Sequence, residues 1–401
     1  DICGSAPNLA SYLARSPGVL DVILDPGFLG SLPSRGQLDE LLGAQIKGAR
    51  DYEGVLDAAR RFAKEQIFRG GVQIIEGTLN PELAGPAFAA IAECTIAGLL
   101  RATEDELAPS VGRVPDGAFA VIAMGKLGGR EMTAASDLDL IFVYDAPDDA
   151  ASDGAKALPA SVYYARLAQR LIAALTVPTA EGTLYEVDMR LRPTGNKGPV
   201  AVSLESFTRY HATESWTWER MALTRARVTA GSAALGVRVA DVIRATLTAT
   251  AETSRIVRDA ADMREKLAAQ FPGRSFWDLK FASGGLVDIE FVAQTLQLVE
   301  AGRQISNSNT ISALGALRDE GVLSAGDADT LIAAYTLELA LTQVLRIAVD
   351  GAFDAAAATP GLKTLLARAG GEADFDRLEA KLRDQQARAA AVFQDKIGRA
   401  G

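Results

Sequence analysis

The amino-acid sequence predicts an α+β protein that is predominantly helical and has one small mixed sheet. Three observations lead to this prediction: residues 1–110 carry helical patterns, residues 118–200 alternate between strand and helix patterns, and helical patterns dominate again from about residue 203. Apolar residues three or four positions apart indicate a helix, whereas strict alternation indicates a half-buried strand. We therefore expect a sheet-containing core between two helical regions, with domains at residues 1–112, 113–235 and 236–401.

The first region begins with Ser5-Ala6-Pro7-Asn8, a segment typical of a helix start. Further along, apolar residues recur at helical spacing and predict a buried helix face; they are Val55, Ala58, Ala59, Phe62 and Ala63. The segment P-S-V-G-R-V-P-D-G at 109–117 contains proline and glycine and predicts a break before the first strand.

Residues 119–145 give the most informative pattern, F-A-V-I-A-M-G-K-L-G-G-R-E-M-T-A-A-S-D-L-D-L-I-F-V-Y-D. It predicts a strand, a glycine turn, a short connector and a second strand that carries Asp137 and Asp139. Side chains alternate along a strand, so the two carboxylates share one face while Leu138 and Leu140 point into the core. A magnesium ion bound to nucleotide phosphates would relieve their repulsion. The alternative is a pair of solvated or ion-paired acids.

After a polar loop that reaches about Pro159 and a helix from about Ser161 to Thr176, residues 184–193 predict an alternating strand ended by Pro193. One face of this strand would carry four charged residues, Glu186, Asp188, Arg190 and Arg192. Beside the first acidic strand, Asp188 would become a third carboxylate. Three acids can hold two magnesium ions about 3.5–4 Å apart, as in phosphoryl or nucleotidyl transfer. Alternatively, the two arginines only form salt bridges with Glu186 and Asp188.

The glycine turn supplies groups suited to phosphate. Gly128 and Gly129 lack Cβ atoms, so their N–H groups could approach phosphate oxygens closely. Ser136 could add a hydroxyl donor and Lys126 a positive charge. A simple tight turn remains the alternative for the glycines.

The region after residue 203 predicts a helical bundle. Two apolar stripes support it: Ile256, Ala260, Met263 and Leu267, and Leu337, Leu341, Val344, Leu345 and Ala348. Within this region Gly284 and Gly285 could open a helix that binds an anion near Lys280. A hydrogen-bond network between domains, through a polar line at Glu290, Gln294 and Gln297, is the alternative.

Other conspicuous residues precede the bundle. Trp216, Trp218 and Glu219 predict the start of a helix packed under the sheet. Arg225 and Arg227 could reach phosphate or form ion pairs.

Bulk properties limit the classes of function. A length of 401 residues allows two or three domains, and 48% hydrophobic with 23% charged residues is ordinary for a soluble globular protein. A net charge of −10 argues against a nucleic-acid partner, so we expect any polymer partner to be a protein. We find no run of about 18 uncharged apolar residues, which argues against a membrane span. The start, D-I-C-G-S-A-P-N, lacks Met and a secretory pattern, so we expect a fragment of a longer chain.

Cysteine and histidine are scarce. Cys3 and Cys94 are too few for a disulfide framework or a zinc cluster, which favours a reducing, cytoplasmic location. The single histidine, His211, excludes a multi-histidine metal site, and we expect a structural role for it.

Four segments together resemble one family. They are G-K-L-G-G-R-E-M-x-x-x-S-D-L-D-L-I-F-V-Y, E-G-T-L-Y-E-V-D-M-R-L-R-P-T-G, E-S-W-T-W-E-R-M-A-L-T-R-A-R-V, and G-G-L-V-D-I-E-F after W-D-L-K. They resemble the glutamine synthetase adenylyltransferases of the DNA polymerase β-like superfamily, whose full-length enzyme has an adenylylating and a deadenylylating half. The details resemble the C-terminal, adenylylating half.

The resemblance implies a polymerase β-like nucleotidyltransferase core flanked by N-terminal helices and a C-terminal helical bundle. It implies transfer of AMP from ATP to a tyrosine of glutamine synthetase, with Mg²⁺. The implied metal-binding catalytic acids are Asp137, Asp139 and Asp188. The nucleotide-binding candidates are Gly128, Gly129, Ser136, Lys126, Arg190 and Arg192. The PII signalling protein and glutamine are candidate effectors.

Three alternatives stay open. The first is the reverse reaction, phosphorolysis of adenylyl-tyrosine with the same metals. The second is a catalytically silent regulatory module that binds nucleotide or PII. The third is nucleotidyl transfer to a small molecule, which the large helical flanks disfavour.

Overall fold

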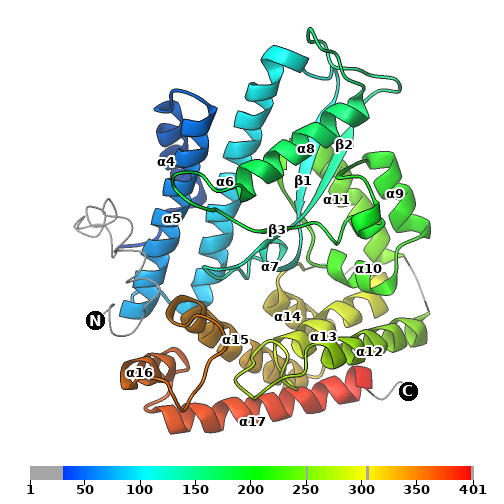
Figure 1. The fold of residues 1–401 in the computed structure, drawn as a ribbon. Helices are drawn as coiled ribbons and strands as arrows, with labels where there is room; N and C mark the ends of the chain where they lie inside the picture. The colour runs from blue at the N-terminus through cyan, green and yellow to red at the C-terminus, as the bar shows by residue number, and fades with distance from the viewer. Residues whose placement is uncertain (1–29, 250–251, 304–306, 399–401) are drawn as a thin grey trace.

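The computed structural model describes residues 30–249, 252–303 and 307–398. Within these ranges the expected α+β class, predominantly helical with a small mixed sheet, is confirmed (Figure 1). The expected helix start at residues 5–8 and Cys3 lie outside the described residues. The division into three domains stays a prediction.

Within residues 30–117, three helices precede the sheet: α4 (Arg35–Lys47), α5 (Tyr52–Glu76) and α6 (Pro81–Val111). The predicted face of α5 is buried at Ala58, Ala59, Phe62 and Ala63 and partly buried at Val55. Helix α6 runs through Pro109, so the predicted break begins later than the sequence indicates, at Gly112.

Among the described residues the sheet has five strands: β1 (Ala118–Ala123), β2 (Leu138–Asp145), β3 (Val187–Asp188), β4 (Ala201–Ser203) and β5 (Arg227–Gly231). Their order is β3-β2-β1-β5, and β4 also pairs with β2. Strand β1 is antiparallel to β2 and β5, whereas β2 is parallel to β3 and β4. The sheet is therefore mixed, as the sequence predicts.

The predicted strand over residues 184–193 is largely wrong, because only Val187 and Asp188 pair with β2. The chain then turns: the Arg190 N–H donates to Asp188 Oδ1 at 2.8 Å, and the Gly195 N–H donates to the Arg192 carbonyl at 2.7 Å. These local bonds satisfy backbone and side-chain groups that a longer strand would have to pair. Consequently Asp188, Arg190 and Arg192 do not share one strand face.

Alternation along β1 and β2 builds two cores, one on each face of the sheet. On one face Val121 and Leu140 pack with α6 and α8 (Ala160–Thr176), which matches the predicted helix. On the other, Ile122 and Ile141 pack under three helices: α9 (Leu204–Thr213), α10 (Thr217–Leu223) and α11 (Ala233–Thr248). The sheet thus lies between helical layers (Figure 1).

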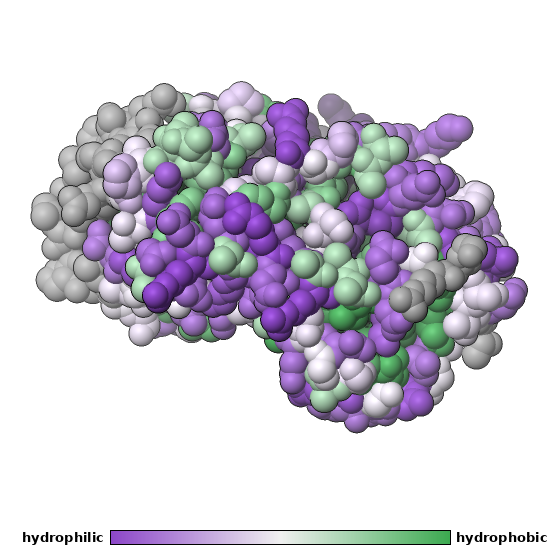
Figure 2. Space-filling model, turned by 90° about the horizontal axis from the view of Figure 1, so that it is seen from below, coloured by the Kyte–Doolittle hydropathy of each residue, from purple (hydrophilic) through white to green (hydrophobic). Residues whose placement is uncertain are grey.

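The C-terminal part is a helical assembly below the sheet (Figure 1). It consists of α12 (Thr253–Gln270), α13 (Leu286–Val299), α14 (Thr310–Asp319), α15 (Ala325–Ala348), α16 (Pro360–Ala369), α17 (Phe375–Phe393) and the π-helical turn η3 (Gln394–Gly398). The predicted stripes are buried at Ile256, Ala260, Leu337, Leu341, Val344 and Ala348. Seen from below, its surface is mostly hydrophilic with scattered apolar patches (Figure 2).

In the part of the chain that the structure describes, two helices, α6 and α15, are long and apolar enough to cross a membrane by length and composition alone. Most of each apolar window is buried inside the protein, 72% for α6 and 61% for α15. Core helices show the same composition, so this is weak support for a span.

Candidate active site

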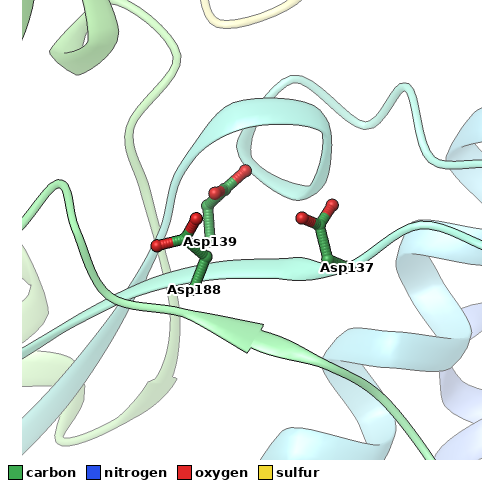
Figure 3. A group of neighbouring side chains, drawn as sticks. All are labelled: Asp137, Asp139 and Asp188. Carbon is green, nitrogen blue, oxygen red and sulfur yellow. The ribbon is translucent and has the colours of Figure 1, made fainter.

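Three carboxylates meet where β2 and β3 run side by side. Asp139 on β2 and Asp188 on β3 are register partners, and Asp137 stands one residue before β2. Each offers one oxygen, and these oxygens lie within 4.8 Å of one another. Figure 3 shows the three side chains gathered above the paired strands. The structure therefore brings together the acids that the sequence singles out.

Ionised carboxylates this close together repel one another, so full ionisation of the group is unfavourable. The pKa of Asp139 is raised to about 6, first by burial and then by the charges of Asp137 and Asp188. Burial also acts to raise the pKa of Asp188, but the hydrogen bonds and charge of Arg190 outweigh it, and the pKa is lowered. A divalent cation among the three oxygens would remove the cost at Asp139.

Arg190 does not fill the space among the acids. Its guanidinium is exposed and forms an ion pair with Asp188. Within the part of the chain that the structure describes, neither Asp137 nor Asp139 has an ion pair with a basic side chain. The sequence alternative of an arginine–carboxylate pair therefore holds for Asp188 and leaves the other two acids open to a cation.

Gly125, which the sequence analysis did not select, lies against these acids. It begins the short helix α7 (Gly125–Gly128) with φ +53, and a Cβ atom there would overlap the Asp139 carboxylate. The neighbouring Met124 N–H donates to the Asp139 carbonyl at 2.9 Å. Glycine is needed here because the turn passes so close to the acid. Its position directly after a predicted strand was the available signal.

Gly128 and Gly129 are placed differently from the expected phosphate cradle. Both are buried and neither borders the cavity beside the acids. A Cβ at Gly128 would overlap the Arg225 carbonyl, and one at Gly129 would press on the Arg225 guanidinium. Close packing of the turn against Arg225 accounts for these glycines.

That cavity has a volume of about 1020 Å³ and joins the acids to basic groups. Of the predicted residues it is lined by Asp137, Asp139, Asp188, Lys126, Ser136 and Arg190, and it also borders Gly125, Arg225, Lys280, Glu290 and Arg346.

The predicted Ser136 and Arg192 differ in their relation to this cavity. Ser136 Oγ accepts a hydrogen bond from the Thr133 N–H at 2.8 Å, which fixes the loop before Asp137. Arg192 is turned away: its guanidinium donates to the Met189 carbonyl at 2.8 Å, and it does not line the cavity. Arg192 braces the turn after β3.

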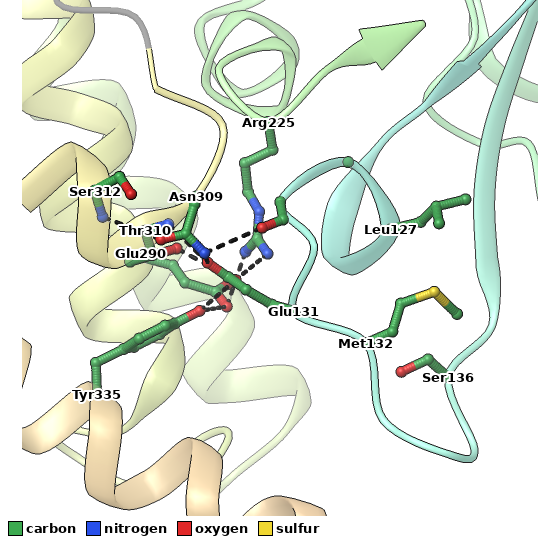
Figure 4. Close-up of polar contacts among 12 residues, drawn as sticks. Leu127, Glu131, Met132, Ser136, Arg225, Glu290, Asn309, Thr310, Ser312 and Tyr335 are labelled. Atoms are coloured by element: carbon green, nitrogen blue, oxygen red, sulfur yellow. Dashed lines mark hydrogen bonds and ion pairs between the residues drawn. The ribbon is translucent and has the colours of Figure 1, made fainter. Parts of the chain in front are cut away.

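A buried polar network ties the turn after α7 to the helical bundle (Figure 4). Glu131, only 3% exposed, forms an ion pair with Arg225 and accepts from the Thr310 N–H at 2.7 Å and the Tyr335 hydroxyl at 2.6 Å. Arg225 also pairs with Glu290 on α13 at 2.9 Å. Burial acts to lower the pKa of Arg225, but Glu131 and Glu290 outweigh it and raise the pKa. Arg225 is therefore ion-paired, as one of its two alternatives expects, and Glu290 takes part in a buried polar network that connects α13 to the turn after α7.

Arg227 likewise serves as a brace. It forms an ion pair with Glu93 on α6 and donates to the Leu127 carbonyl at 3.1 Å.

The N-terminus of α13 is occupied by its own chain. The Gly284 N–H donates to Asp288 Oδ2 at 2.6 Å, and Asp288 pairs with Arg264 of α12. The first helical N–H groups, those of Leu286 and Val287, also donate to the Leu279 and Lys280 carbonyls, so the expected anion site at Gly284 and Gly285 is not available.

The expectation that Trp216 and Trp218 pack under the sheet is wrong. Helix α10 does start after Trp216, but Trp216 is 66% and Trp218 36% exposed, so neither packs under the sheet. Glu219 is the buried member; it accepts from the Tyr210 hydroxyl and the Trp216 N–H, each at 2.8 Å.

His211 is buried beside the Phe207 ring. Burial first, and then the charge of Arg220, lower the pKa of His211 to about 4, so the imidazole is neutral at pH 7.

Two protein-family models together match most of this chain. A family model described as glutamate-ammonia ligase adenylyltransferase matches residues 1–242, and one described as GlnD PII-uridylyltransferase matches residues 260–396. The chain is similar to proteins named bifunctional glutamine synthetase adenylyltransferase/adenylyl-removing enzyme. Identity is 44% over 98% of the chain in Bradyrhizobium diazoefficiens, 43% over 99% in Rhodopseudomonas palustris (strain BisB5), and 42% over 100% in Rhizobium meliloti (strain 1021).

The chain spans 40–41% of the length of these relatives. The match nevertheless covers the three acids, the glycine turn and the Glu131–Arg225 ion pair. The chain therefore belongs to the glutamate-ammonia ligase adenylyltransferase family.

Proposed function

We propose that this chain transfers AMP from ATP to a tyrosine hydroxyl of glutamine synthetase, on a polymerase β-like nucleotidyltransferase core. The observation that carries the proposal is the meeting of Asp137, Asp139 and Asp188 on two parallel strands beside a cavity of about 1020 Å³. Membership of the family supplies the substrate, since the relatives are named for glutamine synthetase.

The acidic group fits magnesium. Its donors are carboxylate oxygens, which Mg²⁺ prefers together with phosphate oxygens. A cation would offset the burial and the neighbouring negative charges that raise the pKa of Asp139, and the absence of a Cβ at Gly125 leaves space for the Asp139 carboxylate. Asp137, Asp139 and Asp188 would hold the magnesium. Bound there, magnesium would acidify the attacking hydroxyl and neutralise charge on the leaving pyrophosphate.

In the proposed reaction the tyrosine oxygen forms a bond to the α-phosphorus of ATP. The bond between that phosphorus and the oxygen bridging to the β-phosphate breaks, and its electron pair leaves with pyrophosphate. Asp188, which Arg190 keeps ionised, accepts the hydroxyl proton. Ser136 and Lys126 border the same cavity and are proposed nucleotide contacts, and Arg190 is proposed at its rim.

Other partners rest on the resemblance and are proposals too. The PII protein and glutamine are proposed effectors. A cytoplasmic location is proposed because the relatives' named substrate is a metabolic enzyme.

The test is transfer of α-labelled AMP from ATP to purified glutamine synthetase. Asp137→Asn and Asp139→Asn should each lower transfer by about a hundredfold or more while the chain stays folded. Asp148→Asn is the matched control, because this exposed acid lies after β2 and outside the cavity. Transfer that survives in both cavity variants would overturn the assignment.

The reverse reaction is a second candidate, because the relatives are named as adenylyl-removing as well. It is tested by supplying adenylylated glutamine synthetase with phosphate. ADP release without AMP incorporation in the forward assay would replace the forward assignment. Calorimetric ATP binding with no turnover in either direction would instead identify a silent nucleotide-binding module.

A further inference from the structure

Three cations line the same cavity as the acidic group and come from distant parts of the chain. They are Lys126 on α7, Lys280 in the segment before α13, and Arg346 on α15. Among the residues that the structure describes, no ion pair joins any of these three to a carboxylate. The other two cations of the wall, Arg190 and Arg225, are both paired.

The three positive charges act on one another without a counter-charge of their own. Burial lowers the pKa of Lys126, the charge of Glu290 opposes this, and Lys280 and Arg346 lower it further. Glu290 is already engaged, since it pairs with Arg225 at 2.9 Å and accepts from the Tyr335 hydroxyl at 3.0 Å. A cluster of like charges around a cavity is stabilised when an anion enters it.

The cluster also faces the acids. The positive charge of Lys280 acts to lower the pKa of Asp139, so its field reaches the proposed metal site. An anion held by the cluster would therefore lie next to magnesium bound by the acids. The same three cations border an adjoining cavity of about 560 Å³, lined by aromatic residues and without the acidic group. The cavity with the acids is the one in which metal and anion can share a ligand.

We propose that Lys126, Lys280 and Arg346 bind the β- and γ-phosphates of the nucleotide and hold the pyrophosphate as it leaves. This proposal rests on the proposed function. The three cations provide a separate group for each of several phosphate charges, and ammonium and guanidinium groups form the strongest hydrogen bonds to phosphate. The C-terminal helical region then contributes Lys280 and Arg346 to the nucleotide site. The polar network through Glu131 and Arg225 holds this region in a fixed position relative to the acids.

The test measures binding and not only turnover. Magnesium pyrophosphate, magnesium ATP and AMP are titrated calorimetrically into the whole chain and into Lys280→Met, Arg346→Gln and the double variant. Lys280 and Arg346 are exposed, so these changes leave the core intact. Each single variant should weaken pyrophosphate binding about tenfold, and the double variant more than either, because each removes one charge-assisted contact.

AMP binding should change less than about twofold in all three variants, because AMP lacks the β- and γ-phosphates. Lys266→Met and Arg258→Gln are matched controls, since both are exposed on α12 and outside the cavity. They should bind every ligand as the unaltered chain does, which excludes a general effect of net charge.

Two results would overturn the proposal, and they differ in what else they affect. Pyrophosphate binding that is unchanged in the double variant, with transfer intact in the unaltered chain, would remove the cluster from the site but leave the proposed function standing. If the unaltered chain binds neither ATP nor pyrophosphate, both the proposed function and the proposed phosphate site are contradicted.

Discussion

Asp139 is a partly buried acid between two others, and its raised pKa ties the stability of the chain to pH. Its pKa is about 6 in the folded state, against an ordinary value of 3.8 for an aspartic acid side chain. Because the folded state binds the proton more tightly, the stabilising contribution is present at low pH and is lost as pH rises through about 6. The charge that the proposed chemistry needs is therefore a cost to the metal-free fold.

Asp139→Asn should relieve this cost. In the presence of a chelator the variant should be more stable than the unaltered chain at pH 8, by about 1–2 kcal/mol after allowance for solvent screening, and the gain should shrink toward pH 4. Urea unfolding at several pH values measures it. Excess magnesium should raise the free energy of unfolding of the unaltered chain only. A stability difference that does not vary with pH would contradict the electrostatic explanation.

Gly125 permits the close approach of the turn to Asp139. Gly125→Ala should displace the carboxylate and lower AMP transfer by about tenfold or more, because small displacements at a reacting centre are costly. The positive φ of +53 adds about 1 kcal/mol of backbone strain. Gly43→Ala on α4 is the control, because no atom lies within 4 Å of the added methyl group. Normal transfer and magnesium affinity in Gly125→Ala would refute this account.

At the level of helices and strands, short segments depend on contacts that local pattern does not reveal. Strand β3 is two residues long because Asp188 caps the turn that follows it. The α13 start shows the same dependence: Gly284 has φ +77, and a Cβ there would overlap the Gln386 carbonyl of α17.

Gly284→Ala should therefore destabilise the bundle by more than about 2 kcal/mol, through strain and overlap together. Gly321→Ala separates the two causes, since Gly321 has φ +71 but no atom within 4 Å of the added methyl group. The control should cost about 1 kcal/mol. Chemical denaturation of both variants gives the comparison, and equal losses would show that packing against α17 contributes nothing.

Across the molecule, one buried network connects the sheet-bearing core to the bundle. Glu131 lies in the turn after α7, Arg225 lies between α10 and β5, and Tyr335 lies on α15, and the three are buried together (Figure 4). Removing one partner of a buried ion pair leaves an uncompensated charge. The core and the bundle should consequently lose their register when Arg225 is replaced.

Arg225→Met should lower the free energy of unfolding by about 3–5 kcal/mol and weaken ATP binding. Arg209→Gln is the control: it removes an exposed ion pair with Glu205 and should cost less than about 1 kcal/mol. Denaturation and calorimetry on both variants measure the effects. An Arg225→Met chain with normal stability and ATP affinity would show that the network does not hold the two parts together.

The elements with strong local patterns were the ones that sequence could predict. Alternation in β1 and β2 and the helical spacing in α5 and α8 reflect burial of one face, which each segment records in its own residues. The end of α6 was predicted too early, because the helix continues through Pro109. The strand β3 was predicted too long, because a turn held by Asp188 forms directly after it.

The sequence by itself determined the fold class and placed two acids on one strand face, since side-chain direction follows from backbone geometry alone. It also pointed to Asp188 as the third acid. Only the tertiary structure decided that Gly125 borders Asp139 and that Lys280 and Arg346 line the same cavity as Asp139. Residues more than a hundred positions apart share a site only when the whole chain has packed, and no local periodicity encodes that contact.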